Sequence, residues 1–508
     1  MKTHRACGAA LAPLILALAA TPAAAGDPPF APVQAEAFAV AGSVSNAWAD
    51  FDSDGDLDMA VSLKSGEVRL YRNDDGVFVS VGAALGLPVE GMEIRGLSWG
   101  DFNNDGHVDL LGGSNLMGDR AANRSFVWRN EGGRGFVDVA ESVGLTVPGR
   151  VSRQANWIDY DNDGHLDLYA ADRAGPNQLY RNANGRFSPV MGEGGVNDPR
   201  PTVGACWLDF DRDGDLDLFL ANQSGATDAL WRNDGATFTD VAPELGLEQP
   251  GRDRSVGGVG CAVGDYDNDG HLDIFVAVYG ANLLYRNTGD GGFTEMAAQA
   301  GVNDDGHAVG AAWGDIDNDG DLDLFVTEYE GEPGQQLPAN RLYRNDGAGR
   351  FEQALTPESP LNAGDHGVEW IDFNNDGALD LSLTDGYGPD GGHFVFRNLM
   401  DAPARGRSLS VLVSGEGGKG VAPGAEVRLY DAGGRILAAR QVSTGGGYNA
   451  QSAGPVHFGL ASMEPVTVEV TWMGPSGPRI QRLPDVNPAA YAGRRLTITP
   501  EGASSGTP

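Results

Sequence analysis

The chain is poor in cysteine, histidine and basic residues. Of its 508 residues, three are cysteine and eight are histidine, and 35 lysine and arginine residues stand against 71 acidic ones, giving a formal net charge of −36. Such an acid excess disfavours nucleic acids and anionic membranes as partners, because both are polyanions. The hydrophobic content of 41% nevertheless supports packed cores and argues against a disordered chain.

Signatures of several enzyme classes are also missing. The sequence has no H-E-x-x-H, no C-x-x-C pair and no Walker-type glycine loop. Its two G-x-S-x-G matches, at residues 96–100 and 502–506, do not stand in the strand-to-helix context of a nucleophile elbow. After the N-terminal segment, no stretch reaches the roughly 18 uninterrupted apolar residues of a transmembrane helix. The motifs therefore do not point to a known nucleophilic, zinc-dependent or nucleotide-binding enzyme.

The N-terminus has the features of a secretory signal. Lys2 and Arg5 precede an apolar run from Ala9 to Ala20, and Ala23–Ala25 offers a small-residue cleavage site. The run is short for a membrane span, and an apolar first strand is the alternative. We expect residues 1–25 to be a signal peptide and the mature protein to be soluble and secreted, periplasmic or at the cell surface.

The mature chain would keep two cysteines, Cys206 and Cys261. An oxidising compartment permits a disulfide between them. They precede equivalent acidic loops by three and four positions, however, so they point to opposite faces of their strands. We therefore expect two buried thiols rather than a disulfide.

A nine-residue acidic motif recurs seven times and holds 29 of the 71 acidic residues. The charge therefore belongs to a repeated local device rather than to a general surface coat. Each copy is followed by an apolar run, then by an Arg-Asn signature such as LYRN, and in most units by a piece of the FTDVA type. The copies are DFDSDGDLD from Asp50, DFNNDGHVD from Asp101, DYDNDGHLD from Asp159, DFDRDGDLD from Asp209, DYDNDGHLD from Asp265, DIDNDGDLD from Asp315 and DFNNDGALD from Asp372.

The spacing of the repeats predicts the architecture. Each unit offers four short β stretches in roughly 50 residues, and seven such units predict an all-β fold with a seven-bladed β-propeller over residues 28–400. A β-solenoid is the alternative, but it needs shorter rungs. The seventh unit reaches Asn398 without a fourth strand, and Phe30–Phe38 resembles one. We therefore expect the N-terminal segment to complete the last blade and leave no open edge.

Two further repeated features are expected to be architectural. Tryptophan stands two positions before the first aspartate of six of the seven loops, which we interpret as packing between blades rather than as an aromatic binding ring. The Arg-Asn pair recurs in every unit, and we expect its arginine to bridge neighbouring blades or acidic loops.

The acidic motif has the form of a calcium-binding loop. Oxygen ligands at positions 1, 3 and 5 can converge on one ion because glycine at position 6 permits a sharp turn, and aspartate at position 9 can close the shell. The helix–loop–helix calcium motif needs glutamate at position 12, where all seven loops have glycine or an apolar residue. The dense oxygen cage suits Ca²⁺ better than Mg²⁺, so we expect up to seven structural calcium ions. An acidic turn without metal is the alternative.

Five positions of each loop are predicted ligands. Position 7 varies among aspartate, histidine and alanine, so we expect only its backbone carbonyl to bind. The predicted metal-binding residues are Asp50, Asp52, Asp54, Asp56, Asp58, Asp101, Asn103, Asp105, His107, Asp109, Asp159, Asp161, Asp163, His165, Asp167, Asp209, Asp211, Asp213, Asp215, Asp217, Asp265, Asp267, Asp269, His271, Asp273, Asp315, Asp317, Asp319, Asp321, Asp323, Asp372, Asn374, Asp376, Ala378 and Asp380.

Charged residues cluster where the chain enters each innermost strand. If the acidic loops lie on one face of the disc, these entry segments surround the channel mouth on the other. The ring is a candidate ligand or active site, and ordinary solvated loops with salt bridges are the alternative. The candidate ligand-binding residues are Glu93, Arg95, Arg153, Arg200, Arg254, His307 and His366, and the candidates for acid–base catalysis are His307, His366 and Glu369.

The C-terminal region predicts a second domain. From Ser408 the sequence alternates over short strands, which predicts a β-sandwich over residues 403–498 and a disordered tail over residues 499–508. His457 lies in an apolar strand and is expected to be a hydrogen-bonded core residue. Tyr448 lies with Gln451 in a glycine-rich loop that could bind a ligand, although we favour a tight turn.

The residues also resemble a known family over about residues 40–480. The repeats are similar to FG-GAP/VCBS repeats, as in the integrin α-subunit propeller. The segments VAPGAEVRLYDAGG, QVSTGGGYNAQS, VHFGLA and VTVEVTWMGPSG resemble the ASPIC/UnbV domain that follows such repeats in the cartilage acidic protein family, here in a bacterial-type homologue. An Asn-Arg stretch is absent before Gly424, and the usual Trp-Pro-x-Gly is loosened after Trp472. The resemblance implies a secreted, calcium-binding propeller but does not settle an activity.

Three functions are compatible with these features. The first is an exported calcium-binding protein that mediates extracellular or cell-surface adhesion with a protein or carbohydrate partner. The second is a secreted glycan lyase, hydrolase or cyclase with its active site at the channel mouth. The third is a structural repeat protein whose C-terminal sandwich is the binding unit. An enzyme should hold His366 in a deep pocket with a shifted pKa, whereas an interaction module should present a broad, shallow surface.

Overall fold

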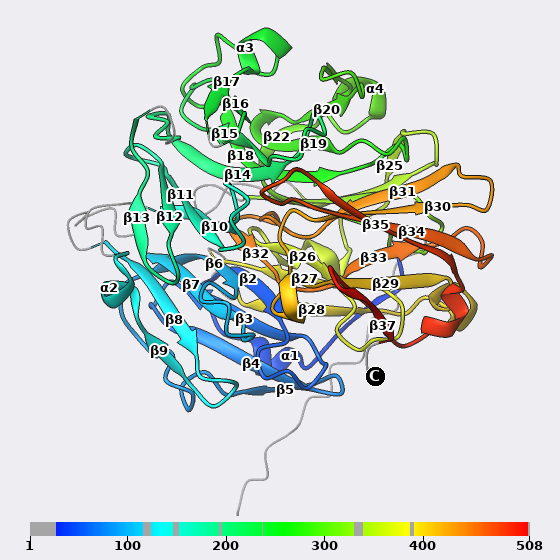
Figure 1. The fold of residues 1–508 in the computed structure, drawn as a ribbon, viewed down its shortest axis with the longest axis horizontal. Helices are drawn as coiled ribbons and strands as arrows, with labels where there is room; N and C mark the ends of the chain where they lie inside the picture. Colours follow the sequence, from blue (N-terminus) through cyan, green and yellow to red (C-terminus); the bar gives the residue numbers. More distant parts are fainter. Residues whose placement is uncertain are drawn as a thin grey trace, which may run out of the picture.

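The computed structural model describes residues 27–114, 123–145, 152–192, 196–235, 237–329, 339–386 and 391–505, and the predicted signal peptide lies outside these ranges. Within them the fold is all-β, as predicted, and sheets of four antiparallel strands recur along the chain (Figure 1). No helix of the described residues combines the length and the apolar character needed to cross a membrane.

Each propeller unit uses its four strands in the same way. The innermost strand enters the acidic loop, the second strand leaves it, the third carries the Arg-Asn pair, and the short fourth lies outermost. In the first four units the strands are β2 (Ser43–Ala49), β3 (Asp58–Leu63), β4 (Val68–Asp74) and β5 (Val77–Ser80); β6 (Ile94–Gly100), β7 (Asp109–Ser114), β8 (Ser125–Asn130) and β9 (Phe136–Asp138); β10 (Ser152–Ile158), β11 (Asp167–Asp172), β12 (Gln178–Asn182) and β13 (Phe187–Pro189); and β14 (Thr202–Leu208), β15 (Asp217–Asn222), β16 (Ala229–Asn233) and β17 (Phe238–Asp240).

The remaining units follow the same plan. Their strands are β18 (Gly257–Gly264), β19 (Asp273–Ala281), β20 (Leu283–Asn287) and β21 (Phe293–Glu295); β22 (Asp305–Gly314), β23 (Asp323–Glu328), β24 (Arg341–Asn345) and β25 (Phe351–Gln353); and β26 (Val368–Ile371), β27 (Asp380–Thr384) and β28 (His393–Asn398), with β1 (Phe30–Pro32) beside β28. Short helices occupy connections: α1 (Ala35–Phe38), α2 (Ala140–Val143), α3 (Ala242–Leu245), α4 (Ala297–Ala300), α5 (Ala402–Arg405), η3 (Pro360–Ala363), η4 (Glu416–Gly418) and η5 (Pro488–Tyr491).

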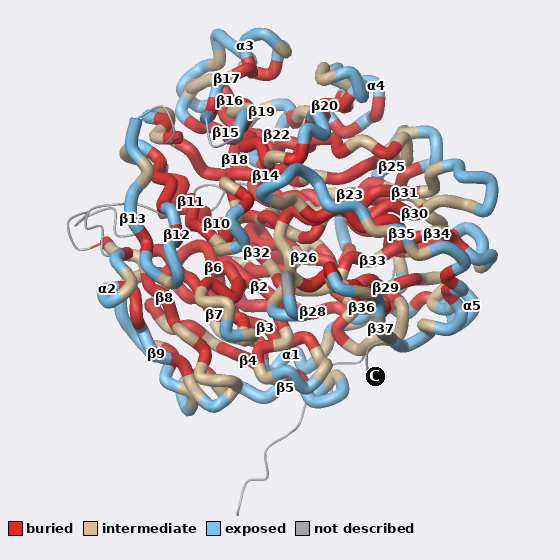
Figure 2. Tube along the Cα trace, in the orientation of Figure 1, coloured by how far each residue is buried: buried red, intermediate tan, exposed pale blue. Residues whose placement is uncertain are grey.

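The innermost strands succeed one another around a common centre. They contact in the order β2, β6, β10, β14, β18, β22 and β26, and β26 in turn contacts β2. In the last sheet, β1 pairs antiparallel with β28, so the N-terminal segment supplies the outermost strand there. We interpret this arrangement as a propeller of seven blades. Figure 2 shows that the central strands are mostly buried and the outer turns mostly exposed.

The tryptophans pack between neighbouring units, which confirms their predicted role. Trp99 and Trp157 are fully buried. The indole N–H of Trp99 donates to the carbonyl of Ala47 in the preceding unit at 3.1 Å, and that of Trp157 donates to Ser98 at 3.3 Å. Burying these large rings between stacked sheets removes much apolar surface from water.

The asparagine of the Arg-Asn pair joins adjacent units. The side-chain amide of Asn130 donates to the carbonyl of Phe51 in the preceding unit at 2.7 Å and to Val108 in its own unit at 3.1 Å. Its backbone N–H donates to Asp109 Oδ1 at 2.8 Å. Because the asparagine is buried, both carbonyls would otherwise lack donors.

The arginine of the pair acts more locally than predicted. Arg286 pairs with Asp267 and Asp269 of the acidic loop in its own unit, and Arg72 pairs with the nearby Asp74. The pair is therefore architectural, as expected, but bridging between units belongs to the asparagine.

The expectation of two separate thiols is wrong, because Cys206 and Cys261 form a disulfide. Cys206 lies in β14 and Cys261 in β18, which are neighbouring innermost strands with these Cα atoms 6.2 Å apart. The two residues do point to opposite faces of equivalent strands. Sheets of adjacent units stack face to face, however, so opposite faces of neighbouring strands meet. The bond suggests an oxidising compartment.

The C-terminal region contains two four-stranded sheets around its own apolar core. Its strands are β29 (Ser408–Val413), β30 (Glu426–Tyr430), β31 (Ile436–Gln441), β33 (Val456–Gly459), β34 (Val466–Trp472), β35 (Arg479–Val486), β36 (Arg495–Thr499) and β37 (Gly502–Ser505), while β32 (Ala450–Gln451) leaves the domain to pair with β6. The predicted disordered tail is wrong for 502–505, because β37 pairs with β36.

Candidate functional site: acidic loops and channel mouth

The seven acidic loops share one backbone geometry. Position 4 and the glycine at position 6 have positive φ in every copy, as at Ser53 (63°) and Gly55 (104°) of the first loop. The carboxylate at position 1 fixes the turn: Asp50 Oδ1 accepts the N–H of Asp54, and Oδ2 accepts that of Gly55, each at 3.1 Å. Two left-handed residues thus fold the chain around its own acidic side chains. Sequence reasoning recognised position 6 but missed position 4, where asparagine recurs because it tolerates this conformation.

Carboxylates converge in the loops as a metal site requires. In five loops, three side chains offer ligand atoms that all lie within 4.8 Å of one another. The sets are Asp50, Asp52 and Asp58; Asp159, Asp161 and Asp167; Asp209, Asp211 and Asp217; Asp265, Asp267 and Asp269; and Asp315, Asp317 and Asp323. The other two loops have an amide at position 3, Asn103 and Asn374, and this oxygen can also bind a cation.

Unused oxygens at position 3 show that these loops fit a cation. The Oδ1 atoms of Asp52, Asp161, Asp267 and Asp317 are buried and have no hydrogen-bond partner within the described residues. A buried acceptor without a donor is unfavourable, and a carboxylate more so. A metal ion would supply the missing partner and neutralise the crowded charge.

The aspartate at position 9 anchors the loop to its sheet. Asp58 is fully buried, and its two oxygens accept backbone N–H groups from Phe51 at 3.1 Å and from Asn73 at 2.8 Å. Burial raises the pKa of Asp58 to about 8 and that of Asp167 to about 9. These carboxyls lack a full counter-charge from the protein, which again favours a bound cation.

The position-7 side chains bind the following turn. Asp56 Oδ2 accepts the N–H of Asp75 at 2.9 Å, and Asp215 Oδ2 accepts that of Gly235 at 3.0 Å. This arrangement is compatible with the predicted use of the carbonyl alone, which stays a prediction.

The loops are also linked to one another. The amide of Asn162 at position 4 donates to Asp215 Oδ1 in the next loop at 2.7 Å, and Asn268 makes the equivalent bond to Asp321 at 2.7 Å. The loops therefore form a connected belt, in which a change at one can reach its neighbour.

The C-terminal domain rests on this belt. The backbone N–H of Ala439 donates to Asp265 Oδ2 at 3.0 Å, Arg495 donates to Asn375 Oδ1 at 3.2 Å, and the ammonium of Lys419 donates to the Asn104 carbonyl at 2.9 Å. These contacts reach the second, fifth and seventh loops. The domain thus covers the acidic-loop face.

A loop of the C-terminal domain enters the centre of the propeller. Its strand β32 pairs parallel with β6, and the Val368 N–H donates to the carbonyl of Gly447 at 2.7 Å. Gln451 bonds both backbone groups of Trp157, accepting at 2.8 Å and donating at 2.9 Å. Thr444 donates to Trp207 at 2.8 Å. We call residues 443–454 the channel loop.

The interpretation of Tyr448 and Gln451 as a tight turn is therefore incomplete. Gln451 binds an innermost strand, as described above, and Tyr448 packs against Val203, Val259 and Val309 of three further innermost strands. The glycines that suggested a turn allow close backbone approach to the surrounding strands. The partners lie far away in sequence, which is why local reasoning could not find them.

Tyr448 reaches the channel mouth opposite the acidic loops. It is buried, has φ of 85°, and its hydroxyl accepts a hydrogen bond from Arg95 Nη1 at 3.2 Å. Its ring lies 5.1 Å from that of His366, centroid to centroid. Burial raises the pKa of Tyr448, but Arg95, Arg153 and Arg173 outweigh this effect, so that the pKa is lowered.

His366 is held by several neighbours at the mouth. Its Nδ1 lies 2.5 Å from Asp365 Oδ1, and the Tyr329 ring packs edge-on at 5.5 Å. Burial lowers the pKa of His366, although Asp365 opposes this shift. The predicted register of Arg95, Arg153 and His366 thus brings three buried side chains toward the phenol of Tyr448.

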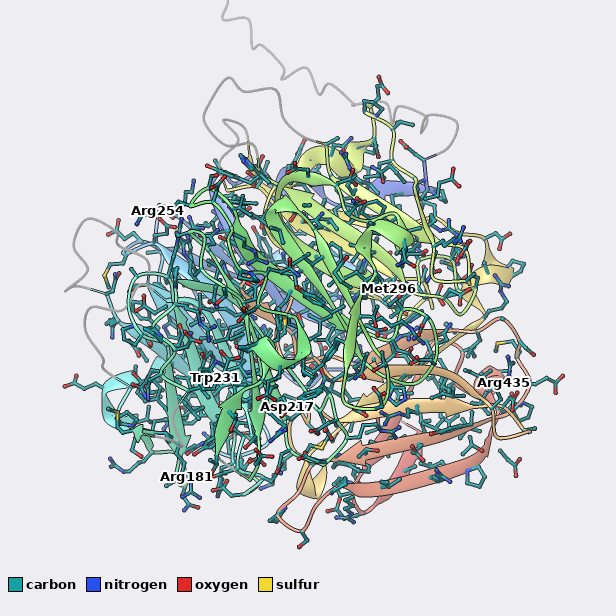
Figure 3. All side chains as sticks on the ribbon, turned by 90° about the horizontal axis from the view of Figure 1, so that it is seen from above. Arg181, Asp217, Trp231, Arg254, Met296 and Arg435 are labelled. Atoms are coloured by element: carbon teal, nitrogen blue, oxygen red, sulfur yellow. A yellow bond between two sulfur atoms is a disulfide. The ribbon has the colours of Figure 1, made fainter. Side chains whose placement is uncertain are left out.

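The other predicted mouth residues are placed differently. Glu93 pairs with Arg95, whereas Arg200 pairs with Asp198 and Asp240. Arg254 is exposed and lies at the edge of the view in Figure 3. The ring of His307, itself exposed, lies 5.0 Å from that of Tyr279.

The three acid–base candidates do not assemble. Glu369 lines a cavity on the C-terminal side, with Trp370 and His457, rather than the mouth. The channel loop intervenes, since Gly447 binds Val368 between His366 and Glu369. Burial raises the pKa of Glu369 to about 8.

Sequence reasoning missed a second ring of mouth residues. Lys64, Arg173, Tyr279 and Tyr329 each stand 14 positions after the first aspartate of their loops, where the second strand returns to the mouth. These four residues could have been found by aligning the seven repeats. The strand after each acidic loop runs antiparallel to the strand before it, so it returns the chain to the mouth.

Comparison with family models agrees with this construction. Residues 50–112, 159–220, 209–276, 265–326 and 331–382 match the FG-GAP-like repeat, and residues 415–505 match the ASPIC and UnbV domain. The chain belongs to the FG-GAP-like repeat family. The resemblance read from the sequence is thereby confirmed.

Curated relatives cover the same region. Cartilage acidic protein 1 of Homo sapiens is 26% identical over 377 residues, which are 73% of this chain and 40% of that protein. The Xenopus tropicalis protein of the same name is 28% identical over 388 residues, 74% of this chain and 41% of that protein. The FG-GAP-repeat chain therefore spans about two fifths of the length of these relatives.

Solved structures are similar at low identity. A lectin from Burkholderia pseudomallei has a TM-score of 0.46 and 14% identity, covering 71% of this chain and 97% of the lectin. The exotype rhamnogalacturonan lyase YesX has a TM-score of 0.37 and 13% identity, covering 90% of this chain and 91% of the lyase.

Proposed function

We propose that this FG-GAP-repeat protein is an exported, calcium-stabilised interaction protein that binds an extracellular or cell-surface partner, protein or carbohydrate, at the channel mouth. The observation that carries the proposal is the position of Tyr448. A tyrosine at φ of 85° costs roughly 1–3 kcal/mol of backbone strain. The channel loop holds it there between Arg95 and His366. Strain maintained at a converging set of polar groups is typical of a binding site.

Calcium is the cation that the acidic loops fit best. Their donors are oxygens only, and the buried Oδ1 atoms at position 3 lack partners within the described residues. Ca²⁺ takes 6–8 such oxygens, whereas Mg²⁺ keeps several waters. When bound, the ion supplies charge neutralisation, and the side chains at positions 1, 3, 5 and 9 with the carbonyl at position 7 would hold it. Its role here is structural.

The chemistry of the mouth favours an acidic carbohydrate among the possible partners. The rings of Tyr279 and Tyr329 stack at 6.4 Å and offer faces on which sugar rings pack. Arg95, Arg153 and Arg173 gather positive charge around Tyr448 in a chain whose net charge is −36. Guanidinium groups recognise carboxylates and sulfates by paired hydrogen bonds.

Export is part of the same proposal. The disulfide between Cys206 and Cys261 is typical of an oxidising compartment. The N-terminal sequence has the pattern of a cleaved signal. A secreted, periplasmic or cell-surface location would also supply the calcium concentration at which such loops fill.

Binding to immobilised polygalacturonate and dextran in calcium buffer tests the proposal. We expect the full chain to bind the acidic polymer and not the neutral one. Tyr448→Phe removes only the hydroxyl and should weaken binding about fivefold or more. Arg254→Gln is the matched control, since this exposed arginine precedes β18 and, within the described part of the chain, forms no hydrogen bond with Tyr448. Equal binding to both polymers, or no effect of Tyr448→Phe, would count against the site.

A secreted glycan lyase, hydrolase or cyclase is the second candidate. The lowered pKa of Tyr448 beside the His366–Asp365 pair favours it, because acid–base groups need shifted pKa values. Glu369 would not take part, since it lies beyond the channel loop. Release of new chain ends from polygalacturonate, abolished by Tyr448→Phe, would support this activity.

A further inference from the structure

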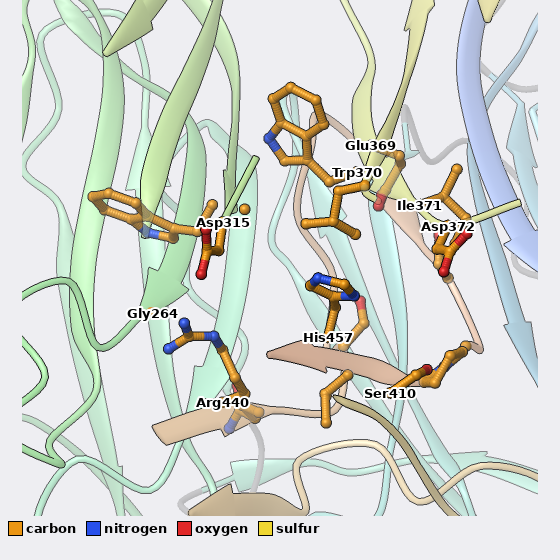
Figure 4. Close-up of a pocket in the computed structure, with 18 of the residues that line it drawn as sticks. Gly264, Asp315, Glu369, Trp370, Ile371, Asp372, Ser410, Arg440 and His457 are labelled. Atoms are coloured by element: carbon orange, nitrogen blue, oxygen red, sulfur yellow. The ribbon is translucent and has the colours of Figure 1, made fainter. Parts of the chain in front are cut away.

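A cavity of about 200 Å³ lies between the C-terminal domain and the acidic-loop ends of β22 and β26 (Figure 4). Trp313 and Trp370 line it from the propeller, and Arg440, Gln441 and His457 line it from the C-terminal domain. An apolar cavity of about 150 Å³ accommodates a molecule the size of benzene. This space therefore has room for a small organic molecule. It is remote from the channel mouth and independent of the function proposed there.

Arg440 is the strongest feature of the cavity. Its residue is 7% exposed, and Nη1 donates to the carbonyl of Ala439 at 2.8 Å. Its Nε and Nη2 atoms are buried and have no hydrogen-bond partner within the described residues. These two atoms form the side-on edge of the guanidinium, which matches the two oxygens of a carboxylate. In Figure 4 the guanidinium extends from its strand toward Gly264 and Asp315.

The neighbouring acidic residues do not satisfy this edge. Asp265, Asp315 and Asp321 act on Arg440 through their charge, but none of them forms an ion pair with it among the described residues. A buried guanidinium left with two idle donors is costly. The arrangement is therefore complete only with an additional acceptor.

Two further lining atoms define the rest of the ligand. Gln441 Nε2 is a buried donor without a partner in the described part of the chain. His457 Nε2 lies 2.8 Å from Asn318 Oδ1, while Asn318 Nδ2 donates to the carbonyls of Gly377 and Ala404. Because Nδ2 of Asn318 is the donor to those carbonyls, its Oδ1 faces His457 as an acceptor. The imidazole hydrogen of His457 therefore lies on Nε2. His457 Nδ1, buried and also without a partner, is left as an acceptor.

We infer that this interdomain cavity binds a small hydroxycarboxylate, with the carboxylate on the Nε–Nη2 edge of Arg440 and a hydroxyl donating to His457 Nδ1. The remaining body of the ligand packs between Trp313 and Trp370. Ser410 and Ser452 line the same space, but the Ser452 hydroxyl already accepts the Trp48 N–H at 3.1 Å, so Ser410 is the serine that offers a further hydrogen bond. No sequence motif indicated this site, because its walls come from two domains.

Mandelate is the probe, because it carries a carboxylate, a hydroxyl and a ring that suits the tryptophan walls. Calorimetric titration of the calcium-loaded full chain should show binding of mandelate. Phenylacetate lacks the hydroxyl, and mandelamide lacks the charge. We expect each analogue to bind at least about tenfold more weakly, since each leaves one buried group unpaired.

Two variants test the residues directly. Arg440→Lys keeps the charge but loses the paired edge and should weaken mandelate binding at least about tenfold. Arg495→Lys is the matched control: it changes an arginine on the same face of the same domain, which bonds Asn375 and does not line the cavity. Should Arg440→Lys fail to fold, the three-ligand comparison on the unaltered chain still decides. Absence of mandelate binding, equal binding of the three ligands, or equal effects of the two variants would each overturn the inference.

Discussion

Asn73 donates its side-chain N–H to the carbonyl of Phe373 at 2.8 Å, across 300 residues of sequence. The same amide donates to Leu57 in its own unit at 3.1 Å. In every unit the asparagine of the Arg-Asn pair donates to a carbonyl of the preceding unit, and we call this bond the clamp. Here the clamp links the first unit to the last. The N-terminal strand β1 beside β28 acts at the same junction. The two ends of the repeat are thus tied by backbone pairing and by a buried amide.

Asn73→Ala should destabilise the fold by about 2–3 kcal/mol, because it leaves two buried carbonyls without donors. Urea denaturation measures the change. Arg72→Ala is the neighbouring control; its side chain is 41% exposed and, among the residues that the structure describes, forms an ion pair with Asp74 alone, so we expect a change within about 0.5 kcal/mol. Equal effects of the two substitutions would show that the clamp contributes little.

Removal of calcium should lower the melting temperature markedly. Each ion bound only by the folded chain adds about 2.7 kcal/mol when its free concentration is 100 times its Kd. Melting curves with and without EGTA provide the measurement, and readdition of Ca²⁺ should restore the midpoint better than Mg²⁺. An unchanged midpoint after chelation would contradict the structural role of the loops.

Glu328 should make stability fall as pH rises. Burial raises its pKa from 4.5 to about 7, so the folded state favours the neutral carboxyl. The stabilising contribution is complete below the unfolded pKa of about 4.5 and is lost as the pH approaches 7. Glu328→Gln keeps an acceptor for the His307 N–H but cannot ionise.

The variant should therefore match the unaltered chain near pH 4 and exceed it in stability by up to about 3 kcal/mol near pH 8. Free energies of unfolding at several pH values give the comparison. If the difference between the two proteins does not change with pH, the carboxyl is not buried in its neutral form.

Reduction of the disulfide should destabilise the fourth and fifth units together. The bond closes a loop across a separation of 55 residues, for which chain entropy predicts a loss of about 4 kcal/mol. Urea midpoints with and without reductant provide the measurement. The variant with Cys206→Ala and Cys261→Ala should be less stable and insensitive to reductant. If the double variant still lost stability on addition of reductant, the effect of the reductant would not come from this disulfide.

The sequence was sufficient to predict the repeated units but not the contacts between them. Acidic loops, strand periods and tryptophan positions are local patterns, and the strands follow them. The disulfide was mispredicted because equivalent positions on stacked sheets face each other with opposite parity. The channel loop was missed because Tyr448 meets Val203, Val259 and Val309, which local periodicity cannot bring together. The cavity at Arg440 likewise needs two domains in place.

The channel loop depends on a glycine that no other residue can replace. Gly447 has φ of 58°, and a Cβ added there would lie 2.0 Å from the carbonyl oxygen of Val368. Gly434 also has positive φ, at 80°, but an added Cβ would meet nothing within 4 Å. The two glycines therefore share backbone strain and differ only in the clash.

Gly447→Ala should accordingly destabilise the protein by several kcal/mol, whereas Gly434→Ala should cost only about 1 kcal/mol, the strain of alanine in a left-handed conformation. Urea denaturation of both variants gives the comparison. Gly447→Ala should also weaken any binding at the channel mouth, because it displaces the neighbouring Tyr448, and Gly434→Ala should not. Should both variants lose the same stability and retain the same binding, the channel loop would not be seated among the innermost strands as described.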